Sequence, residues 1–180
     1  MSRSVVLLRA VNVGGTALPM AKLREALSRA GSPALATLGA SGNAVVDTNA
    51  GGEGARLETA IQTALAEVGR VETEVFVRSR AQWDAIVRGN PFSEAATTDP
   101  AHLVVTVLKS APSRSAWSGL ERAIVGRERV AAGQRHAYLV YPDGIGRSKL
   151  TAAVLERQLG VRSTSRNWNT VLALQSLLDQ

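Results

Sequence analysis

The run Val5-Val6-Leu7-Leu8 is continuously apolar and contains two β-branched residues. Such a run predicts a strand that is buried on both faces of its sheet. The polar and glycine-containing stretch Asn12-Val13-Gly14-Gly15-Thr16 ends it. Pro19 then suits the start of a helix, because the first turn needs no N–H there. A helix is predicted here, because Met20, Leu23, Leu27 and Ala30 recur at helical spacing. Gly31 is expected to end it as a left-handed cap.

Outward from this unit, the chain predicts a turn between two strands, then a helix and a further strand. Ala34–Leu38 and Ala44–Thr48 are the strands on either side of the turn Ser41-Gly42-Asn43. A helix follows with its apolar stripe at Leu57, Ile61, Ala64, Leu65 and Val68, and residues 74–79 form a strand. The order β-α-β-β-α-β is the split arrangement of ferredoxin-like domains.

The second half predicts the same order again, after a connecting helix over 82–88 and a loop over 93–100. No residue-level similarity between the halves supports this repeat, so it rests on element order alone. The predicted elements are a strand over 102–109, a helix over 115–125, a hairpin of 128–131 and 134–141, a helix over 149–159, a short strand over 161–163 and a final helix over 170–178.

These elements predict an α+β fold of two ferredoxin-like halves, each an antiparallel or mixed sheet with helices on one face, plus a C-terminal helix. We expect residues 1–90 to form the first half with its connecting helix. Residues 91–180 then form the second half with the C-terminal helix. One compact domain is the alternative, because 180 residues suit either organisation.

Composition excludes several classes of site. The chain has 45% hydrophobic residues, no cysteine and only two histidines, His102 and His136. Disulfides, thiolate metal sites, Fe–S clusters and cysteine nucleophiles are therefore excluded, and we expect no metal and no cofactor. The N-terminal apolar run is too short for a secretory signal, and no run is long enough to span a bilayer. The expected location is the cytoplasm, with no membrane partner.

The formal net charge is +6, and 18 of the 21 basic residues are arginine. Such a balance favours anionic partners. The alternative is that abundant arginine reflects genomic base composition. No Lys/Arg-rich tail is present, so an electrostatic arm for nucleic acid is not expected.

Two segments of the first half are candidate ligand loops. Arg9 follows a buried strand, where a charge needs a partner or a cleft, and Asn12, Gly14 and Gly15 follow it. The alternative is a structural turn with Arg9 in an internal ion pair. In the second segment Ser41 and Asn43 can offer neutral hydrogen bonds, and the alternative is a plain hairpin turn.

The third segment is Tyr141-Pro142-Asp143-Gly144-Ile145-Gly146-Arg147-Ser148-Lys149. Pro-Asp-Gly predicts a turn, and Ser148 is suited to cap a helix that starts at Lys149. Free amides at that helix start, beside two cations, would make an anion site. The candidate residues are Gly146, Arg147, Ser148 and Lys149, and the alternative is a turn with a helix cap.

The fourth segment is Thr164-Ser165-Arg166-Asn167-Trp168-Asn169-Thr170. Its Ser, Thr and Asn residues suit the cap of the last helix, and Trp168 is expected to be a packing anchor. Arg166, Asn167 and Asn169 could instead form a polar rim around a ligand. Nucleophile elbows, HExxH and acidic clusters with metal spacing are absent from the sequence, so no catalytic residue is predicted.

Several motifs resemble the bacterial family catalogued as domain of unknown function 1697 (DUF1697). The family pattern includes LLRGINVGG, SGNVVF, an R followed by NPF, YPDGIGRSKL and TRNWNTV. The corresponding stretches here are residues 7–15, Ser41-Gly42-Asn43-Ala44-Val45-Val46, Arg78 with Asn90-Pro91-Phe92, 141–150 without a mismatch, and Ser165-Arg166-Asn167-Trp168-Asn169-Thr170-Val171.

Two positions depart from the family pattern. Ala10 stands where the family usually has glycine, which implies less backbone freedom, and Thr37-Leu38-Gly39 replaces an aromatic and polar stretch before Ser41. The resemblance implies an α+β fold of two ferredoxin-like halves. It implies no activity.

The leading functional hypothesis is binding of an anionic ligand, namely a nucleotide, a phosphorylated metabolite or nucleic acid, through Arg/Lys side chains and glycine-rich loops. Aromatic residues are only 4% of the chain, which disfavours base-stacking recognition of RNA. One alternative is a structural or protein-interaction role without a ligand. A second is an enzyme acting on a phosphorylated or nucleotide substrate through Arg/Lys electrostatics. The oligomeric state is left open.

Overall fold

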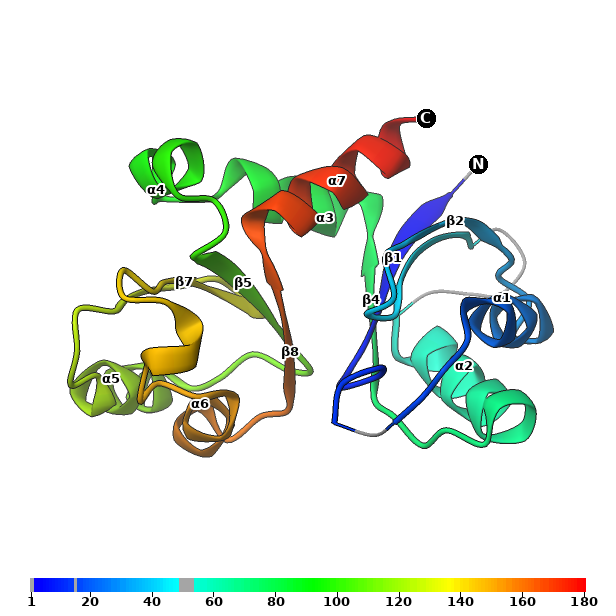
Figure 1. Ribbon diagram of the computed structural model, residues 1–180, viewed down its shortest axis with the longest axis horizontal. Coiled ribbons are helices and arrows are strands. Elements are labelled where there is room, and N and C mark those ends of the chain that lie inside the picture. Colours follow the sequence, from blue (N-terminus) through cyan, green and yellow to red (C-terminus); the bar gives the residue numbers. More distant parts are fainter. Residues whose placement is uncertain (1, 15, 49–53) are drawn as a thin grey trace. The chain divides into compact units, whose positions relative to one another are not determined.

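The computed structural model describes residues 2–14, 16–48 and 54–180, and within them the chain is an α+β protein (Figure 1). The first seven elements are β1 (Arg3–Leu8), α1 (Met20–Arg29), β2 (Ala34–Leu38), β3 (Asn43–Asp47), α2 (Gly54–Gly69), β4 (Val75–Ser79) and α3 (Arg80–Arg88). After them come α4 (Ser93–Thr98), β5 (Leu103–Leu108), α5 (Arg114–Ala123), β6 (Arg129–Ala132), β7 (His136–Val140), a 3-10 turn (Ile145–Arg147), α6 (Ala152–Leu159), β8 (Ser163–Asn167) and α7 (Trp168–Asp179).

The chain divides into two compact units. Unit 1 comprises the described residues up to Ala85 together with Ala173–Gln180, and unit 2 is Ile86–Leu172. The division therefore falls within helices α3 and α7. The halves 1–90 and 91–180 stay a prediction about domains.

Unit 1 contains a four-stranded antiparallel sheet with the order β2-β3-β1-β4. Strand β1 pairs with both β3 and β4, and five of its six residues are buried. The prediction of a strand buried on both faces is confirmed, because successive side chains of a strand point to opposite faces.

Helices α1 and α2 cover one face of the unit 1 sheet (Figure 1). Their buried leucines and isoleucine pack against alternate residues of β1, β3 and β4, such as Val6, Val46 and Val77. The predicted apolar stripes account for this packing, because residues three and four apart share one face of a helix. Gly31 follows α1 in a left-handed conformation (φ +77°), and Ser32 N donates to Leu27 O (3.0 Å), as in a Schellman cap.

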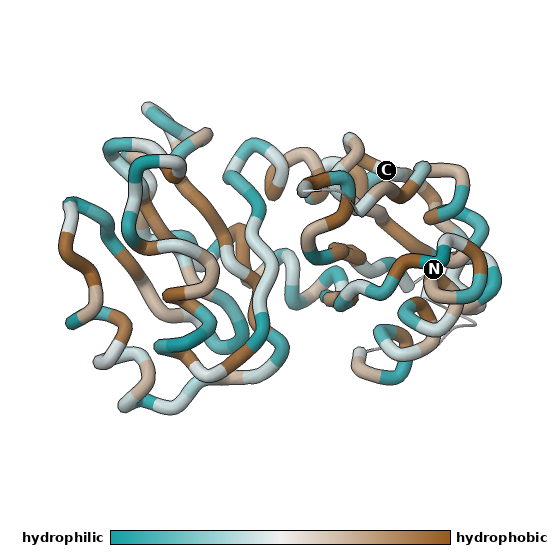
Figure 2. The backbone as a smooth tube through the Cα atoms, turned by 60° about the horizontal axis from the view of Figure 1, so that its bottom comes forward, coloured by the Kyte–Doolittle hydropathy of each residue, from teal (hydrophilic) through white to brown (hydrophobic). Residues whose placement is uncertain are grey.

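Unit 2 contains a second four-stranded antiparallel sheet, ordered β6-β7-β5-β8. Helices α5 and α6 lie on one face of it, and Leu120 and Leu155 pack against alternate residues of β5 and β7. Hydrophobic stretches alternate along the tube with hydrophilic loops, as expected for buried strands joined at the surface (Figure 2). The α+β class with two antiparallel sheets is confirmed, and the order β-α-β-β-α-β occurs in both units.

The last strands of the two sheets match position by position. In β4, Arg78 pairs with Val5 of β1, and in β8, Arg166 pairs with Val105 of β5. The next residue on each strand caps the helix that follows. The strand order and these registers thus supply the correspondence between halves that the residue types did not reveal.

Both caps have the geometry that helix starts require. Ser79 Oγ accepts from Gln82 N (3.3 Å) and Gln82 Oε1 accepts from Ser79 N (3.0 Å), which is a capping box at the start of α3. Asn167 Oδ1 accepts from Thr170 N (3.0 Å) at the start of α7. These side chains satisfy amides that have no partner inside the helix.

Several predicted boundaries were wrong. Residues 93–98 form α4 rather than part of a loop, and α3 begins at Arg80 rather than residue 82, because Ser79 caps it. The last strand is Ser163–Asn167 rather than 161–163, since its side chains are polar and gave no apolar signal. Helix α6 begins at Ala152 rather than Lys149, because Thr151 Oγ1, and not Ser148, accepts from the helix amide of Val154.

Candidate functional site

The loop after β1 is held together by Asn12. Its Nδ2 donates to Leu18 O (2.9 Å) and to Ala40 O (2.6 Å), and its Oδ1 accepts from Leu18 N (2.7 Å). Both amide hydrogens are thereby used within the protein. Asn12 joins the two candidate loops of unit 1, and these contacts give it a structural role.

The neighbouring residues of this loop adopt conformations typical of tight turns. Ala10 and Asn12 both have positive φ, +52° and +55°, and Gly14 has φ +66°. Arg9 is half-buried, its N donates to Glu74 O (3.0 Å), and its O accepts from Thr73 Oγ1 (2.5 Å). Gly15 lies outside the described residues.

The Ser41–Asn43 turn packs against the same loop. Leu8 N donates to Gly42 O (2.8 Å), and Gly42 has φ +71°. Asn43 is buried and donates from Nδ2 to Leu38 O (3.1 Å), whereas Ser41 is exposed. The structure therefore brings the first and second candidate segments together as one interlocked pair of turns.

The third segment forms a different structure in unit 2. Tyr141 is buried at its start and donates from its hydroxyl to Leu150 O (3.1 Å), which ties the two ends of the loop together. Burial raises the pKa of Tyr141 to about 12, so its hydroxyl stays a donor. Gly144 takes φ +85° and leads into the 3-10 turn Ile145–Arg147.

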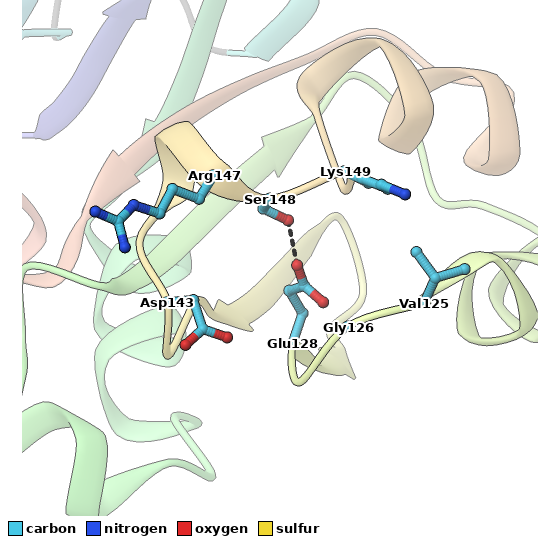
Figure 3. A pocket seen from close by; sticks show the side chains of 7 residues that line it. All are labelled: Val125, Gly126, Glu128, Asp143, Arg147, Ser148 and Lys149. Atoms are coloured by element: carbon cyan, nitrogen blue, oxygen red, sulfur yellow. Dashed lines mark hydrogen bonds between the residues drawn. The ribbon is translucent and has the colours of Figure 1, made fainter.

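This loop forms one wall of a cavity of about 250 Å³ within unit 2 (Figure 3). The segment before β6 forms the other wall. The described residues that line the cavity are Val125, Gly126, Glu128, Asp143, Arg147, Ser148 and Lys149. Of the candidates in the third segment, Arg147, Ser148 and Lys149 line it, and Gly146 does not.

Ser148 links the two walls. Its hydroxyl donates to Glu128 Oε1 and accepts from Leu150 N (2.9 Å). The hydrogen bond from Ser148 is the main reason that the pKa of Glu128 lies below its ordinary value. Ser148 thus fixes an ionised carboxylate in the cavity wall instead of capping a helix.

Asp143 is paired with a cation outside the cavity lining. Arg127 Nε donates to Asp143 Oδ2 (3.1 Å), and Arg127 Nη2 donates to Oδ1, so the pair is bidentate. This pairing is the main cause that lowers the pKa of Asp143, and the charge of Arg147 also lowers it. Both partners are exposed, so the pair is screened by water.

The two cations of the cavity leave the loop in opposite directions. In Figure 3 the Arg147 side chain extends on the side of Asp143, and the Lys149 side chain extends on the side of Val125. Both residues are exposed. The cavity therefore has a cation at each end and the Glu128–Ser148 pair between them, rather than two adjacent cations at a helix start.

The fourth segment has separate roles in β8 and α7. Arg166 Nη1 donates to Thr164 Oγ1 (2.9 Å) and to Ser165 O (2.8 Å), and burial lowers its pKa to about 10. Asn167 caps α7, Trp168 is buried as expected of a packing anchor, and Asn169 is exposed. The described residues of the cavity lining do not include Arg166, Asn167 or Asn169.

Sequence reasoning missed four residues of the cavity wall, and it assigned one of them, Asp143, only to a turn. Val125 was predicted to lie in a helix, but α5 ends at Ala123, and Val125 is 74% exposed. Glu128 was predicted to lie in a strand, and no role was predicted for Gly126. The sequence signal available for these residues was Gly126 followed by the opposite charges of Arg127 and Glu128, directly before strand β6. Ordinary turns show the same pattern, so it does not indicate a site.

Residues 2–14, 16–48 and 54–180 show neither a metal-binding cluster nor a membrane-spanning helix. No group of three or more His, Cys, Asp or Glu side chains lies close enough to hold a metal ion there. In that part of the chain no helix has the length and apolar character needed to cross a bilayer. The cytoplasmic location stays a prediction.

Comparison with known proteins supports both the family resemblance of the motifs and the fold. The DUF1697 family, described as protein of unknown function, matches residues 1–138, and the chain belongs to this family. The matched range ends before the loop 141–150 that lines the cavity. No curated protein matches the chain.

The chain is similar in structure to the conserved bacterial protein SP0830 from Streptococcus pneumoniae. The TM-score is 0.74, the sequence identity is 18%, and the match covers 98% of each chain. At this identity the similarity supports the fold of the whole chain and nothing about a ligand.

Proposed function

We propose that this protein binds a small anionic molecule in the cavity of unit 2. The observation that carries the proposal is a cavity of about 250 Å³ whose ends carry the exposed cations Arg147 and Lys149. The bonds of Tyr141 and Ser148 hold the intervening loop in place, so the site is preformed. A preformed site loses less conformational entropy when a ligand binds.

The size of the cavity favours a small metabolite over nucleic acid. Pockets for drug-sized ligands are typically about 300–1,000 Å³, so a cavity of about 250 Å³ suits a compact molecule. The described lining contains no aromatic side chain on which a base could stack. Nucleotide and nucleic acid are therefore the weaker forms of the anion hypothesis.

The same proposal includes the ferredoxin-like description of both halves. It is supported by the orders β2-β3-β1-β4 and β6-β7-β5-β8, which correspond strand for strand. Sheets of this kind host many unrelated functions, so the argument for binding depends on the cavity and not on the fold.

A thermal-shift screen with inorganic phosphate, sulfate, short carboxylates and nucleotides tests the proposal. A ligand that binds only the native state raises the Tm. We expect a rise with small anions, and we expect Arg147→Ala and Lys149→Ala each to weaken binding about two- to fivefold, as for exposed ion pairs. Arg122→Ala, which removes an exposed arginine of α5, is the matched control and should leave binding unchanged.

Two results would contradict the proposal. One is a wild-type Tm that no small anion raises at millimolar concentration. The other is an anion-dependent rise that persists in the Arg147→Ala/Lys149→Ala double variant, which would place the binding elsewhere.

A further inference from the structure

The cavity wall carries charges of both signs. Arg147 and Lys149 contribute two positive charges, and Glu128 and Asp143 contribute two negative charges among the described lining residues. A site for a highly charged anion would be expected to hold an excess of cations. The lining instead presents both signs within one small cavity.

Asp143 and Glu128 differ in how their charge is compensated. Asp143 has a bidentate cationic partner, Arg127. The side-chain partner of Glu128 is the neutral hydroxyl of Ser148, which stabilises the carboxylate without cancelling its charge. Glu128 is therefore the carboxylate whose charge is left for a ligand to balance.

The second carboxylate oxygen of Glu128, Oε2, also lacks a bonding partner in the described part of the chain. Oε2 is buried and has no hydrogen-bond partner of normal geometry among the described residues. The backbone amides of Glu128 and Gly126 lie near enough to lower the pKa of the carboxyl group after the effect of Ser148. The carboxylate is ionised and its described side-chain partner is neutral, so it attracts a cation placed beside it.

We propose that the ligand is a small zwitterion, with an anionic group at Lys149 or Arg147 and an ammonium group facing the Glu128 carboxylate. This inference rests on the proposed function, because it concerns the same cavity. In Figure 3 the Glu128–Ser148 pair lies between the two cations, so opposite charges alternate along the wall. A ligand with separated charges matches that alternation.

Other small ions fit this wall less well. A monoanion leaves the carboxylate of Glu128 uncompensated. A dianion of similar length places a second negative charge near it, and like charges at close range repel. The cavity should therefore rank ligands by charge pattern at constant length.

Three four-carbon probes measure this ranking directly at pH 7: 4-aminobutyrate is a zwitterion, butyrate a monoanion and succinate a dianion. Calorimetric or NMR titration of the whole chain gives a Kd for each. We expect 4-aminobutyrate to bind most tightly and succinate most weakly. Glycine and β-alanine then vary the charge separation.

Two variants assign the preference to Glu128. Glu128→Gln should reduce the preference for 4-aminobutyrate over butyrate about tenfold, as expected for a charge-assisted hydrogen bond. Gly126→Ala keeps the charge, but its Cβ would overlap the Glu128 carboxylate and displace it. It should reduce the same preference, and it serves as the second test if Glu128→Gln unfolds.

The outcomes separate this inference from the proposed function. If small anions bind but succinate or butyrate binds as tightly as 4-aminobutyrate, the zwitterion inference is wrong and anion binding stands. The inference is also wrong if both variants keep the wild-type preference. If none of the probes and none of the screened anions binds, both proposals are wrong.

Discussion

Unit 1 and unit 2 have corresponding sheets but use their loops differently. In unit 1 the loop after β1 and the turn before β3 bond to each other through Asn12 and Gly42. In unit 2 the hydrogen bond from the Tyr141 hydroxyl to Leu150 O joins the two ends of the loop after β7. This loop lines a cavity together with the segment before β6. Of these described loops, the one after β7 lines a cavity, and it is the one to which we assign the proposed site.

The correspondence extends to the end of each sheet. Arg78 and Arg166 occupy the same register, and Ser79 and Asn167 cap the helices that follow. The two arginines are the same residue type, whereas the two caps differ in type and both accept a hydrogen bond from an amide of the first helical turn. This difference explains why the repeat is visible in geometry and not in the sequence.

The largest expected effect is loss of stability when the closed loop pair of unit 1 is forced apart. In Gly42→Ala the new Cβ would lie 2.7 Å from Leu8 Cβ, at a φ of +71° that side chains disfavour. Overpacking and backbone strain together should cost about 3 kcal/mol. The free energy of unfolding in urea measures it.

Gly39→Ala is the control for that experiment. Gly39 has φ +61°, and nothing lies within 4 Å of the position that an alanine Cβ would take there, so only the backbone strain of about 1 kcal/mol should remain. Equal losses in the two variants would contradict the close packing of the two loops.

The two helix caps should contribute similar amounts in the two units. Asn167→Ala and Ser79→Ala each remove an acceptor from a helix amide, which typically costs about 1 kcal/mol. Asn169→Ala, two residues further along and exposed, should have almost no effect. If Asn169→Ala were as destabilising as Asn167→Ala, the assignment of the α7 cap would be wrong.

A stabilising substitution is expected at Ala10. This alanine has φ +52°, a conformation that costs an L-residue about 1 kcal/mol and glycine almost nothing. Ala10→Gly should therefore raise the free energy of unfolding by up to about 1 kcal/mol. Ala66→Gly, at an exposed position inside helix α2, should lower it by about as much, and a loss in both variants would contradict the strain at Ala10.

The smallest effect concerns acid stability in unit 2. The folded pKa of Glu128 is lowered, chiefly by Ser148, so its stabilising effect is present above the ordinary glutamate pKa of about 4.3. That effect is lost as the pH falls from there through the folded pKa. The Tm advantage of the wild type over Ser148→Ala should therefore shrink progressively as the pH falls below about 5.

Ser118→Ala provides the comparison, because the Ser118 hydroxyl donates to Arg114 O rather than to a carboxylate. Its Tm difference from the wild type should be independent of pH. A Ser148→Ala difference that stays constant or grows on acidification would exclude the coupling to Glu128.

The strands and long helices could be predicted because their signal is local. Apolar runs such as Val5–Leu8 and helical stripes such as that of α1 are set by neighbouring residues. Strand β8 was misplaced because its residues are polar and its position is set by pairing with β5. Pairing between distant segments leaves no periodic pattern in one strand alone.

The candidate residues were predictable as turns but not as a site. Pro-Asp-Gly and Ser148 indicated a bend, and Arg147 with Lys149 indicated charge. The partner of Ser148 is Glu128, twenty residues earlier, and no spacing rule joins the two. The role of Asn12 was equally hidden, since its acceptor Ala40 lies 28 residues away.

The central claim is that unit 2 carries a ligand site and the loop pair of unit 1 does not. Titrating the isotope-labelled whole chain with 4-aminobutyrate, while following its backbone amide NMR signals, tests this directly. Shifts confined to residues 125–128 and 143–149 are the predicted result. Shifts centred on residues 9–14 and 41–43, or none anywhere at saturating probe, would contradict it.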